Sequence, residues 1–183
     1  LVEAVTGTAF ALLFREYGFS LNFVAFALYA TLAIAIAGID LGWMIVPDVL
    51  SLPGLGLGLF FGLMQGRLVD ALLGALVGGG FMLIFYFAVL FLLKKEGLGL
   101  GDAKLLAMVG AFLGWQGALF AIFFASLFGA AVGLILILFG RLRPGQPMPF
   151  GPYIALAGLV LMIWPWQEWI GKLVYYGARL CGS

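Results

Sequence analysis

Residues 69–93 read VDALLGALVGGGFMLIFYFAVLFLL, an apolar run that ends at the charged group Lys94-Lys95-Glu96. About 20 apolar residues are enough for a helix to cross the hydrocarbon core of a bilayer. The run is apolar on every face of a helix and not along a single stripe, which is typical of a helix surrounded by lipid or buried protein. The sequence therefore predicts a transmembrane helix in this region.

The composition of the whole chain agrees with a membrane protein. Hydrophobic residues make up 65% of the 183 positions and charged residues only 9%, against roughly one quarter charged residues in soluble domains. We predict one domain, residues 1–183, that folds as an all-α polytopic transmembrane bundle of about six to seven helices. Short or broken helices are expected near the active site. The predicted helices cover residues 1–17, 21–45, 54–64, 69–93, 102–113, 117–139 and 152–170.

Several classes of protein are excluded by what the chain lacks. A net charge of +1 without a basic cluster gives no sign of nucleic-acid binding. The sequence contains no histidine, and its single cysteine is Cys181, so no metal centre is predicted. The chain opens at Leu1-Val2-Glu3 without a methionine or a basic leader, and we expect a preceding N-terminal segment to be missing.

Two aspartates stand at the ends of apolar runs. Asp102 follows two glycines in residues 99–104, GLGDAK, and Asp40 ends the run at residues 34–40, IAIAGID. A carboxylate inside the membrane costs about 2.5–3.5 kcal/mol on insertion scales, so such residues are usually functional. Two aspartates from separate helices can form the dyad of an aspartic protease, in which one acid activates water while the other polarises the carbonyl.

The glycines before Asp102 also favour this chemistry. Gly99 and Gly101 lack a Cβ, so unwound backbone here is expected to line a wet cavity and admit an extended substrate strand. Two structural alternatives remain open. Asp102 could simply cap a helix, and Asp40 could pair with Lys94 or Lys104 as a salt bridge. Other glycines, at residues 54–58 and 78–80, are expected to serve close helix packing.

Charges at the helix ends predict the orientation. If spans alternate, one side of the membrane carries Lys94, Lys95, Lys104, Arg141 and Arg143. The other side carries Arg15, Arg67, Lys172 and Arg179, together with an expected aromatic belt of Trp164, Trp166 and Trp169. The positive-inside rule places the first side in the cytoplasm. Both aspartates, Asp48 and residues 149–152 fall on that side.

The motifs taken together resemble those of type IV prepilin peptidases, which are GxGD-type intramembrane aspartic proteases of bacteria. Three groups of segments carry the resemblance, in the order and approximate spacing of that family. They are residues 37–40 (AGID) with 46–48 (VPD) and 52–53 (LP), residues 99–105 (GLGDAKL) with 110–115 (GAFLGW), and residues 149–153 (PFGPY). The likeness extends over essentially the whole chain, including residues 1–3.

The resemblance implies an activity and a set of site residues. It implies removal of a short basic leader from type IV prepilins and pseudopilins, after a glycine, at the cytoplasmic face of the bacterial inner membrane, in support of pilus assembly or type II secretion. Asp40 and Asp102 take the catalytic positions. The supporting or substrate-binding positions fall on Asp48, Gly99, Gly101, Lys104, Glu3, Pro149 and Gly151. The first catalytic acid is expected to be Asp40 and not Asp48.

The resemblance also bears on cofactors. The peptidase reaction is expected to need none. Fuller members of the family often carry an earlier span and a cytosolic domain with Cys-x-x-Cys pairs, and they methylate the new pilin N-terminus with S-adenosylmethionine. Residues 1–183 contain no such pair. We therefore expect methylation only in a longer parent protein.

Three other functions were weighed against this one. A small transporter could use Asp40 and Asp102 for proton or cation passage, but it predicts inverted repeats, which the sequence does not show. A non-catalytic scaffold would use the same acids only as helix caps and lysine partners. A presenilin-like protease would usually have a tyrosine before its first acid, whereas Ile39 precedes Asp40.

Overall fold

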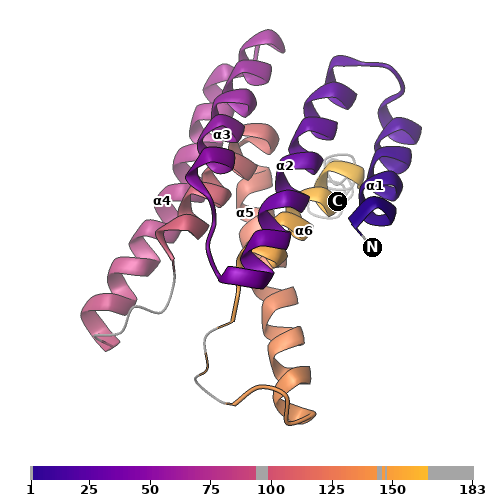
Figure 1. The fold of residues 1–183 in the computed structure, drawn as a ribbon. Coiled ribbons are helices and arrows are strands. Elements are labelled where there is room, and N and C mark those ends of the chain that lie inside the picture. Colours follow the sequence, from indigo (N-terminus) through magenta and orange to yellow (C-terminus); the bar gives the residue numbers. More distant parts are fainter. Residues whose placement is uncertain (1, 94–98, 144–145, 147, 165–183) are drawn as a thin grey trace, which may run out of the picture.

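Six helices make up the fold within the part of the chain that the structure, a computed structural model, describes: residues 2–93, 99–143, 146 and 148–164 (Figure 1). The prediction of an all-α bundle is confirmed. The six helices are α1 (Val2–Tyr17), α2 (Leu21–Trp43), α3 (Asp48–Met64), α4 (Leu68–Leu93), α5 (Leu100–Leu138) and α6 (Gly151–Ile163).

Three of these helices are long and apolar enough to cross a membrane. They are α2, the Leu68–Phe91 part of α4, and α5. Helices α3 and α6 are apolar but shorter. Many large apolar side chains point outward, among them Leu76, Ile84 and Phe91 of α4, which suits a surface that contacts lipid. The chain is thus a multi-pass membrane protein.

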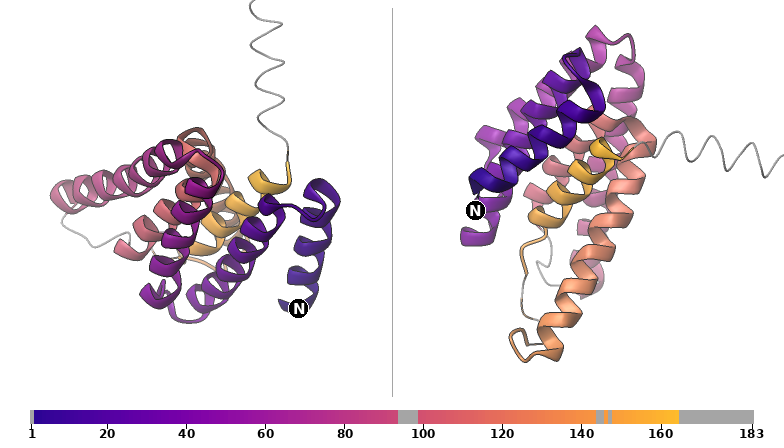
Figure 2. Two further views of the ribbon diagram at one scale, coloured as in Figure 1. Left: turned by 90° about the horizontal axis from the view of Figure 1, so that it is seen from above. Right: turned by 90° about the vertical axis from the view of Figure 1, so that its right-hand side faces the viewer.

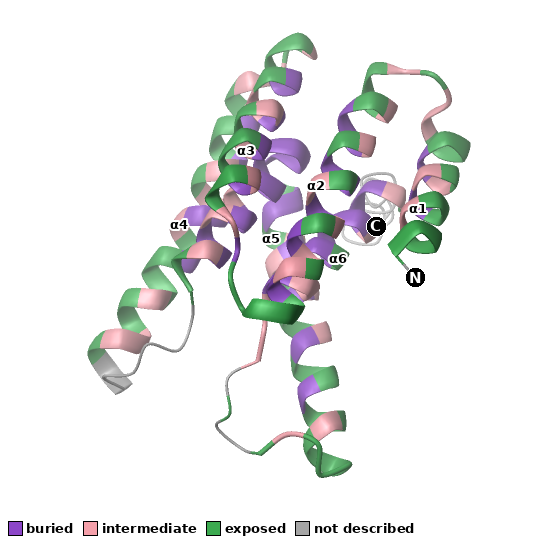
Figure 3. Cartoon of the chain, viewed as in Figure 1, coloured by how far each residue is buried: buried purple, intermediate pink, exposed green. Residues whose placement is uncertain are grey.

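Helix α5 is the centre of the bundle. It packs against α3, α4 and α6, while α2 packs against α1, α3 and α6. Figure 2 shows the same arrangement from above and from the side. Buried residues gather where α2, α5 and α6 meet, and the lower parts of α4 and α5 are largely exposed (Figure 3).

Helix α5 folds back on itself at Gly114, whose φ of 78° and ψ of 179° are not helical. Residues 100–113 run alongside α4, where Gly74 lies against Gly110, and residues 115–138 return in the opposite direction (Figure 1). The predicted break between residues 113 and 117 is therefore confirmed. We call the end of the bundle at this turn the Gly114 end. The opposite end, where α2 finishes and α5 and α6 begin, is the Asp40 end.

Charged side chains at the start of α4 and just before it hold the turn at Gly114. Asp70 Oδ1 accepts a hydrogen bond from the Trp115 N–H at 3.3 Å, and Arg67 Nη2 donates to the Phe112 carbonyl at 2.5 Å. Arg67 Nη1 also lies 3.7 Å from Asp70 Oδ2. A break in a membrane helix leaves backbone groups that must find partners inside the protein. These two side chains supply such partners.

The turn yields a prediction for stability. Alanine at position 114 would hold a backbone region that is essentially restricted to glycine, at a cost of about 1–3 kcal/mol, and its Cβ would overlap the Asp70 carboxylate. Thermal unfolding of Gly114→Ala in detergent should therefore occur well below the wild-type temperature. Gly66→Ala is the control, because Gly66 has a φ of 70° but open space around its Cβ position. An equal loss in both variants would contradict a role for the Asp70 contact.

One predicted helix boundary was wrong. Helix α3 begins at Asp48 and not at residue 54, and Pro53 lies inside it. Pro53 removes only one backbone N–H donor from α3, near the start of the helix. Pro47 is the N-cap and has the extended backbone that precedes a helix. Helix α6 begins at Gly151, one residue before its predicted start. Residues 165–170 of the predicted last helix, with Trp166 and Trp169, lie outside the described part of the chain.

The glycines of α3 and α4 mostly serve close packing, as predicted. Gly54 lies against Met108, and Gly58 lies against Phe112. Gly78 lies against the Leu106 carbonyl. Two members of the predicted sets, Gly56 and Gly80, have open space beside them. A stripe of small residues on α5 is also buried and lies beside residues 148–153 at its far end: Gly117, Ala121, Ala125, Gly129 and Gly133.

Candidate active site

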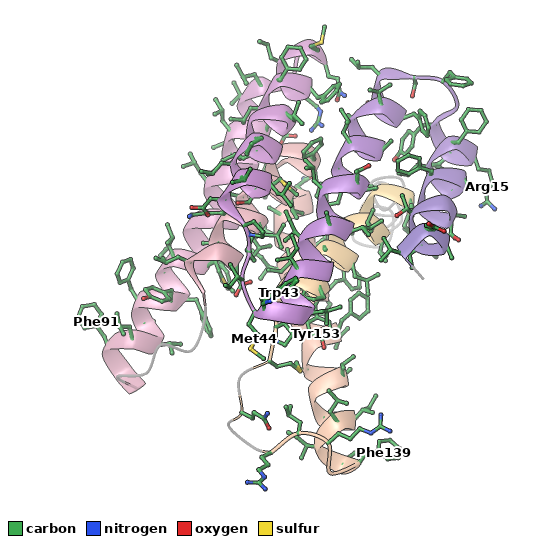
Figure 4. All side chains as sticks on the ribbon, viewed as in Figure 1. Arg15, Trp43, Met44, Phe91, Phe139 and Tyr153 are labelled. Carbon is green, nitrogen blue, oxygen red and sulfur yellow. The ribbon has the colours of Figure 1, made fainter. Side chains whose placement is uncertain are left out.

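The two predicted acids come from different helices and meet at the Asp40 end. Asp40 is in the last turns of α2 and is 4% exposed, and Asp102 is in the first turn of α5 and is 7% exposed. In Figure 4, Trp43 and Met44 mark the end of α2, and Tyr153 marks the start of α6. Buried carboxylates are rare without a specific partner or function.

The partner of Asp40 is the start of α6. Asp40 Oδ2 accepts a hydrogen bond from the Gly151 N–H at 2.9 Å. The free N–H groups at a helix start carry partial positive charge, so they favour a carboxylate there. A Cβ on residue 151 would lie 2.7 Å from the same oxygen. The sequence predicted Gly151 only as a supporting residue. Pro149 and Pro152 stand on either side of it and favour a helix start, which indicates a free N–H at residue 151 that can bind an acid.

The backbone after Asp40 turns sharply. Met44 has a φ of 53°, in the left-handed region, and its N–H donates to the Asp40 carbonyl at 2.8 Å. This turn ends α2 in the way that glycine more often does. It sends the chain through Val46 to Pro47 and the start of α3. The connection therefore crosses the Asp40 end, where Met44, Ile45 and Val46 line the same cavity as the two acids.

Asp102 does not cap its helix. The N-cap of α5 is Gly99, which makes no side-chain cap hydrogen bond, and the Asp102 N–H donates to the Gly99 carbonyl at 3.0 Å. The capping alternative is thus not supported by the geometry. The expected unwinding is limited to Gly99, whose φ of −80° and ψ of 141° are extended, because α5 already begins at Leu100.

The two glycines before Asp102 have different environments. Gly101 packs on Val46, where a Cβ would come within 2.7 Å of the Val46 Cβ. Among the described residues, a Cβ on Gly99 would meet the Gly101 nitrogen and Asp102 Oδ2, at the ordinary contact distances of 3.7 and 3.8 Å. Gly101 therefore serves packing. The clearance expected beside the acid is wrong for Gly101, whereas Gly99 has no close contact with a described residue.

Lys104 pairs with Asp48 and not with Asp40. The Lys104 Nζ lies 2.6 Å and 2.7 Å from the two Asp48 oxygens. Their side chains are 37% and 56% exposed. Lys94, the other partner considered for Asp40, lies outside the described residues. Glu3 is exposed in the first turn of α1 and does not line the site described next.

A cavity of about 780 Å³ brings the remaining predicted residues together. Asp40, Asp48 and Asp102 line it, as do Gly99, Gly101 and Pro149. Its other walls are mostly apolar and were not predicted as site residues: Met44, Ile45, Val46, Phe81, Met82, Phe85, Ser126, Met148 and Phe150. Such a size and lining are typical of ligand-binding pockets.

The cavity can accommodate an apolar chain segment and bring it to two acids. Among the described residues, no group of three or more potential ligands could hold a metal ion. The fold and the site therefore define a polytopic helical membrane protein with a di-aspartate cavity at one end.

Comparison with known proteins places the chain in a family. The type IV leader peptidase family matches residues 26–134, a range that includes Asp40, Asp48 and Asp102. The chain belongs to this family. No solved structure matches it significantly.

Curated relatives are named prepilin leader peptidase/N-methyltransferase. The protein of Aeromonas hydrophila is 44% identical over 133 residues, which cover 72% of this chain and 46% of that relative. The protein of Stutzerimonas stutzeri is 40% identical over 167 residues, covering 90% and 57%. The protein of Xanthomonas campestris pv. campestris is 38% identical over 183 residues, covering 98% and 63%. The chain thus spans about half to two thirds of the length of these relatives.

Proposed function

We propose that this chain is an intramembrane aspartic endopeptidase that removes the leader from type IV prepilins or pseudopilins, with Asp40 and Asp102 as its catalytic dyad. The observation that carries the proposal is that two buried aspartates from separate helices line one cavity. Membership of the type IV leader peptidase family supports the substrate class.

The contacts of the two acids suggest separate roles. The Gly151 N–H and the start of α6 favour the charged form of Asp40, so we assign Asp40 as the base that takes a proton from water. Asp102 would donate a proton to the carbonyl oxygen as water attacks the carbon. The tetrahedral intermediate then collapses: its hydroxyl from the carbonyl oxygen returns a proton to Asp102, and the leaving nitrogen takes the proton that Asp40 accepted from water as the peptide bond breaks. Cleavage is proposed to follow a glycine of the substrate.

The surroundings of the dyad fit a peptide substrate. The apolar walls at Phe81, Met82 and Phe85 suit an apolar segment next to the cleaved bond. Gly99, which has no side chain, lines the cavity with Asp102 and suits the approach of an extended backbone. Asp48 and Lys104 would support the dyad, and Pro149 would shape the cavity.

The cellular setting is part of the proposal. Lys104, Arg141 and Arg143 lie toward the Asp40 end, so the positive-inside rule favours the cytoplasmic side of a bacterial inner membrane for the dyad. Methylation with S-adenosylmethionine is proposed only for a longer parent protein, in line with the names of the relatives.

Passage of protons or cations is less well supported. A second cavity, of about 280 Å³, lies near the Gly114 end and is lined by Arg67 and Asp70 among others. It shares no lining residue with the di-aspartate cavity. The fully buried Phe112 and Tyr29 pack against each other in the core between the ends. A transporter would need a polar route where these rings lie.

The proposed function is tested by cleavage in detergent or proteoliposomes. The substrate is a synthetic prepilin peptide with a basic leader, a glycine and the following apolar segment. We expect one cut after the glycine, identified by mass spectrometry, and equal activity with and without EDTA. Replacing that glycine with leucine should stop cleavage. Loss of activity in EDTA, or cleavage elsewhere, would contradict the proposal.

A further inference from the structure

The connection between α2 and α3 contacts α5 on both sides of Asp102. Val46 packs on Gly101, one residue before the acid, and Asp48 pairs with Lys104, two residues after it. We call these four residues the clasp. The Lys104 Nζ is within hydrogen-bond distance of both Asp48 oxygens, at 2.6 Å and 2.7 Å, so this charge-assisted contact holds the start of α3 close to the first turns of α5.

The same connection is tied to Asp40. The Met44 N–H donates a hydrogen bond to the Asp40 carbonyl at 2.8 Å, and the ring of Pro47 restricts its φ. Few backbone torsions between Asp40 and the clasp are therefore free to rotate. Helices α2 and α5 make little direct contact with each other. Their separation at the two acids must therefore be set through other elements. The connection and the start of α3, which carry Val46 and Asp48, form one such route.

We infer that the clasp positions Asp102 relative to Asp40, and that Asp48 and Lys104 are positioning residues that do not contact the substrate. The inference rests on the proposed function for its kinetic readout. Both oxygens of Asp48 face an ammonium group, which leaves this acid a poor candidate for the second member of a dyad. An exposed ion pair contributes little to stability. Its loss should instead appear in catalysis, because a shift of about 1 Å can slow a reaction about a hundredfold.

The kinetic test compares Asp48→Asn, Lys104→Met and the charge exchange Asp48→Lys/Lys104→Asp in the full chain. We expect each single change to lower kcat about tenfold with KM within about twofold. The exchange should recover most of the lost kcat, because the attraction is restored. Wild-type kcat in either single variant, or an exchange no better than the singles, would overturn the inference. A rise in KM at unchanged kcat would also overturn it, since that result indicates direct substrate binding.

A second test does not depend on activity. Asp40→Cys/Asp102→Cys is prepared with Cys181→Ser, and a short bis-methanethiosulfonate reagent crosslinks the two positions. Adding Asp48→Asn should slow crosslinking about threefold or more, because the distance between residues 40 and 102 would vary more widely. The charge exchange should restore the crosslinking rate. An unchanged rate would contradict the clasp. If the crosslinking responds while the wild type cleaves no prepilin peptide, the proposed function fails and the clasp stands.

Discussion

Asp40→Asn and Asp102→Asn should each lower the rate of prepilin cleavage by about a thousandfold or more. Asparagine keeps the size of the side chain but can neither take nor give a proton at the pH of the reaction. Both acids are buried and line the same cavity, so a second water molecule cannot readily take over the proton transfer that either acid performs. The measurement is single-turnover cleavage by purified variants, followed by mass spectrometry.

Two comparisons make that result specific. Glu16→Gln removes an exposed carboxylate at the Gly114 end and should leave the rate unchanged. Asp48→Asn should lose far less activity than either dyad variant, because Asp48 is paired with Lys104. Full activity in Asp40→Asn or Asp102→Asn would contradict the assignment of these two acids as the catalytic dyad. A larger loss in Asp48→Asn than in Asp40→Asn would move the first catalytic role to Asp48.

Gly151→Ala should lower kcat about a hundredfold, the second largest effect expected. The added Cβ would lie 2.7 Å from Asp40 Oδ2, so the carboxylate must move away from the N–H that holds it. KM should change little, because the residue contacts the acid and not the bound peptide. Steady-state kinetics on the same prepilin peptide measures both quantities.

A matched glycine is available as the control. Gly56 is also inside a helix, but nothing lies within 4 Å of its Cβ position. Gly56→Ala should therefore keep wild-type kcat and unfold no earlier. If Gly151→Ala and Gly56→Ala behave alike, the hydrogen bond from Gly151 does not hold the acid. A Gly151→Ala protein that unfolds at the wild-type temperature yet is slow would be the clearest support.

Much of the fold could be predicted from the sequence because apolar runs and breakers mark helix ends directly. The break before residue 117 followed from short apolar runs around Gly114, and the structure has a glycine-only backbone there. The start of α3 could not be predicted in the same way. Two prolines within seven residues usually indicate a turn, but Pro53 needs to lose only one hydrogen bond near a helix start.

The candidate site was predicted in its residues but not in its contacts. Asp40, Asp102 and the glycines are visible as polar or flexible residues within apolar sequence. The hydrogen bond between Gly151 and Asp40, and the pairing of Asp48 with Lys104, join residues that are 111 and 56 positions apart. No local pattern determines which acid faces which partner at such separations. The packing of α6 against α2 and of α3 against α5 brings these partners together.

The turn at Gly114 has a practical consequence for anyone who alters this protein. It is held by Arg67 and Asp70 at one end of the bundle, while the acids lie at the other. Changes near the turn should therefore reduce how much protein reaches the membrane intact, without changing the turnover of each molecule that does. Yield and turnover can then be improved independently, by working on opposite ends of the bundle.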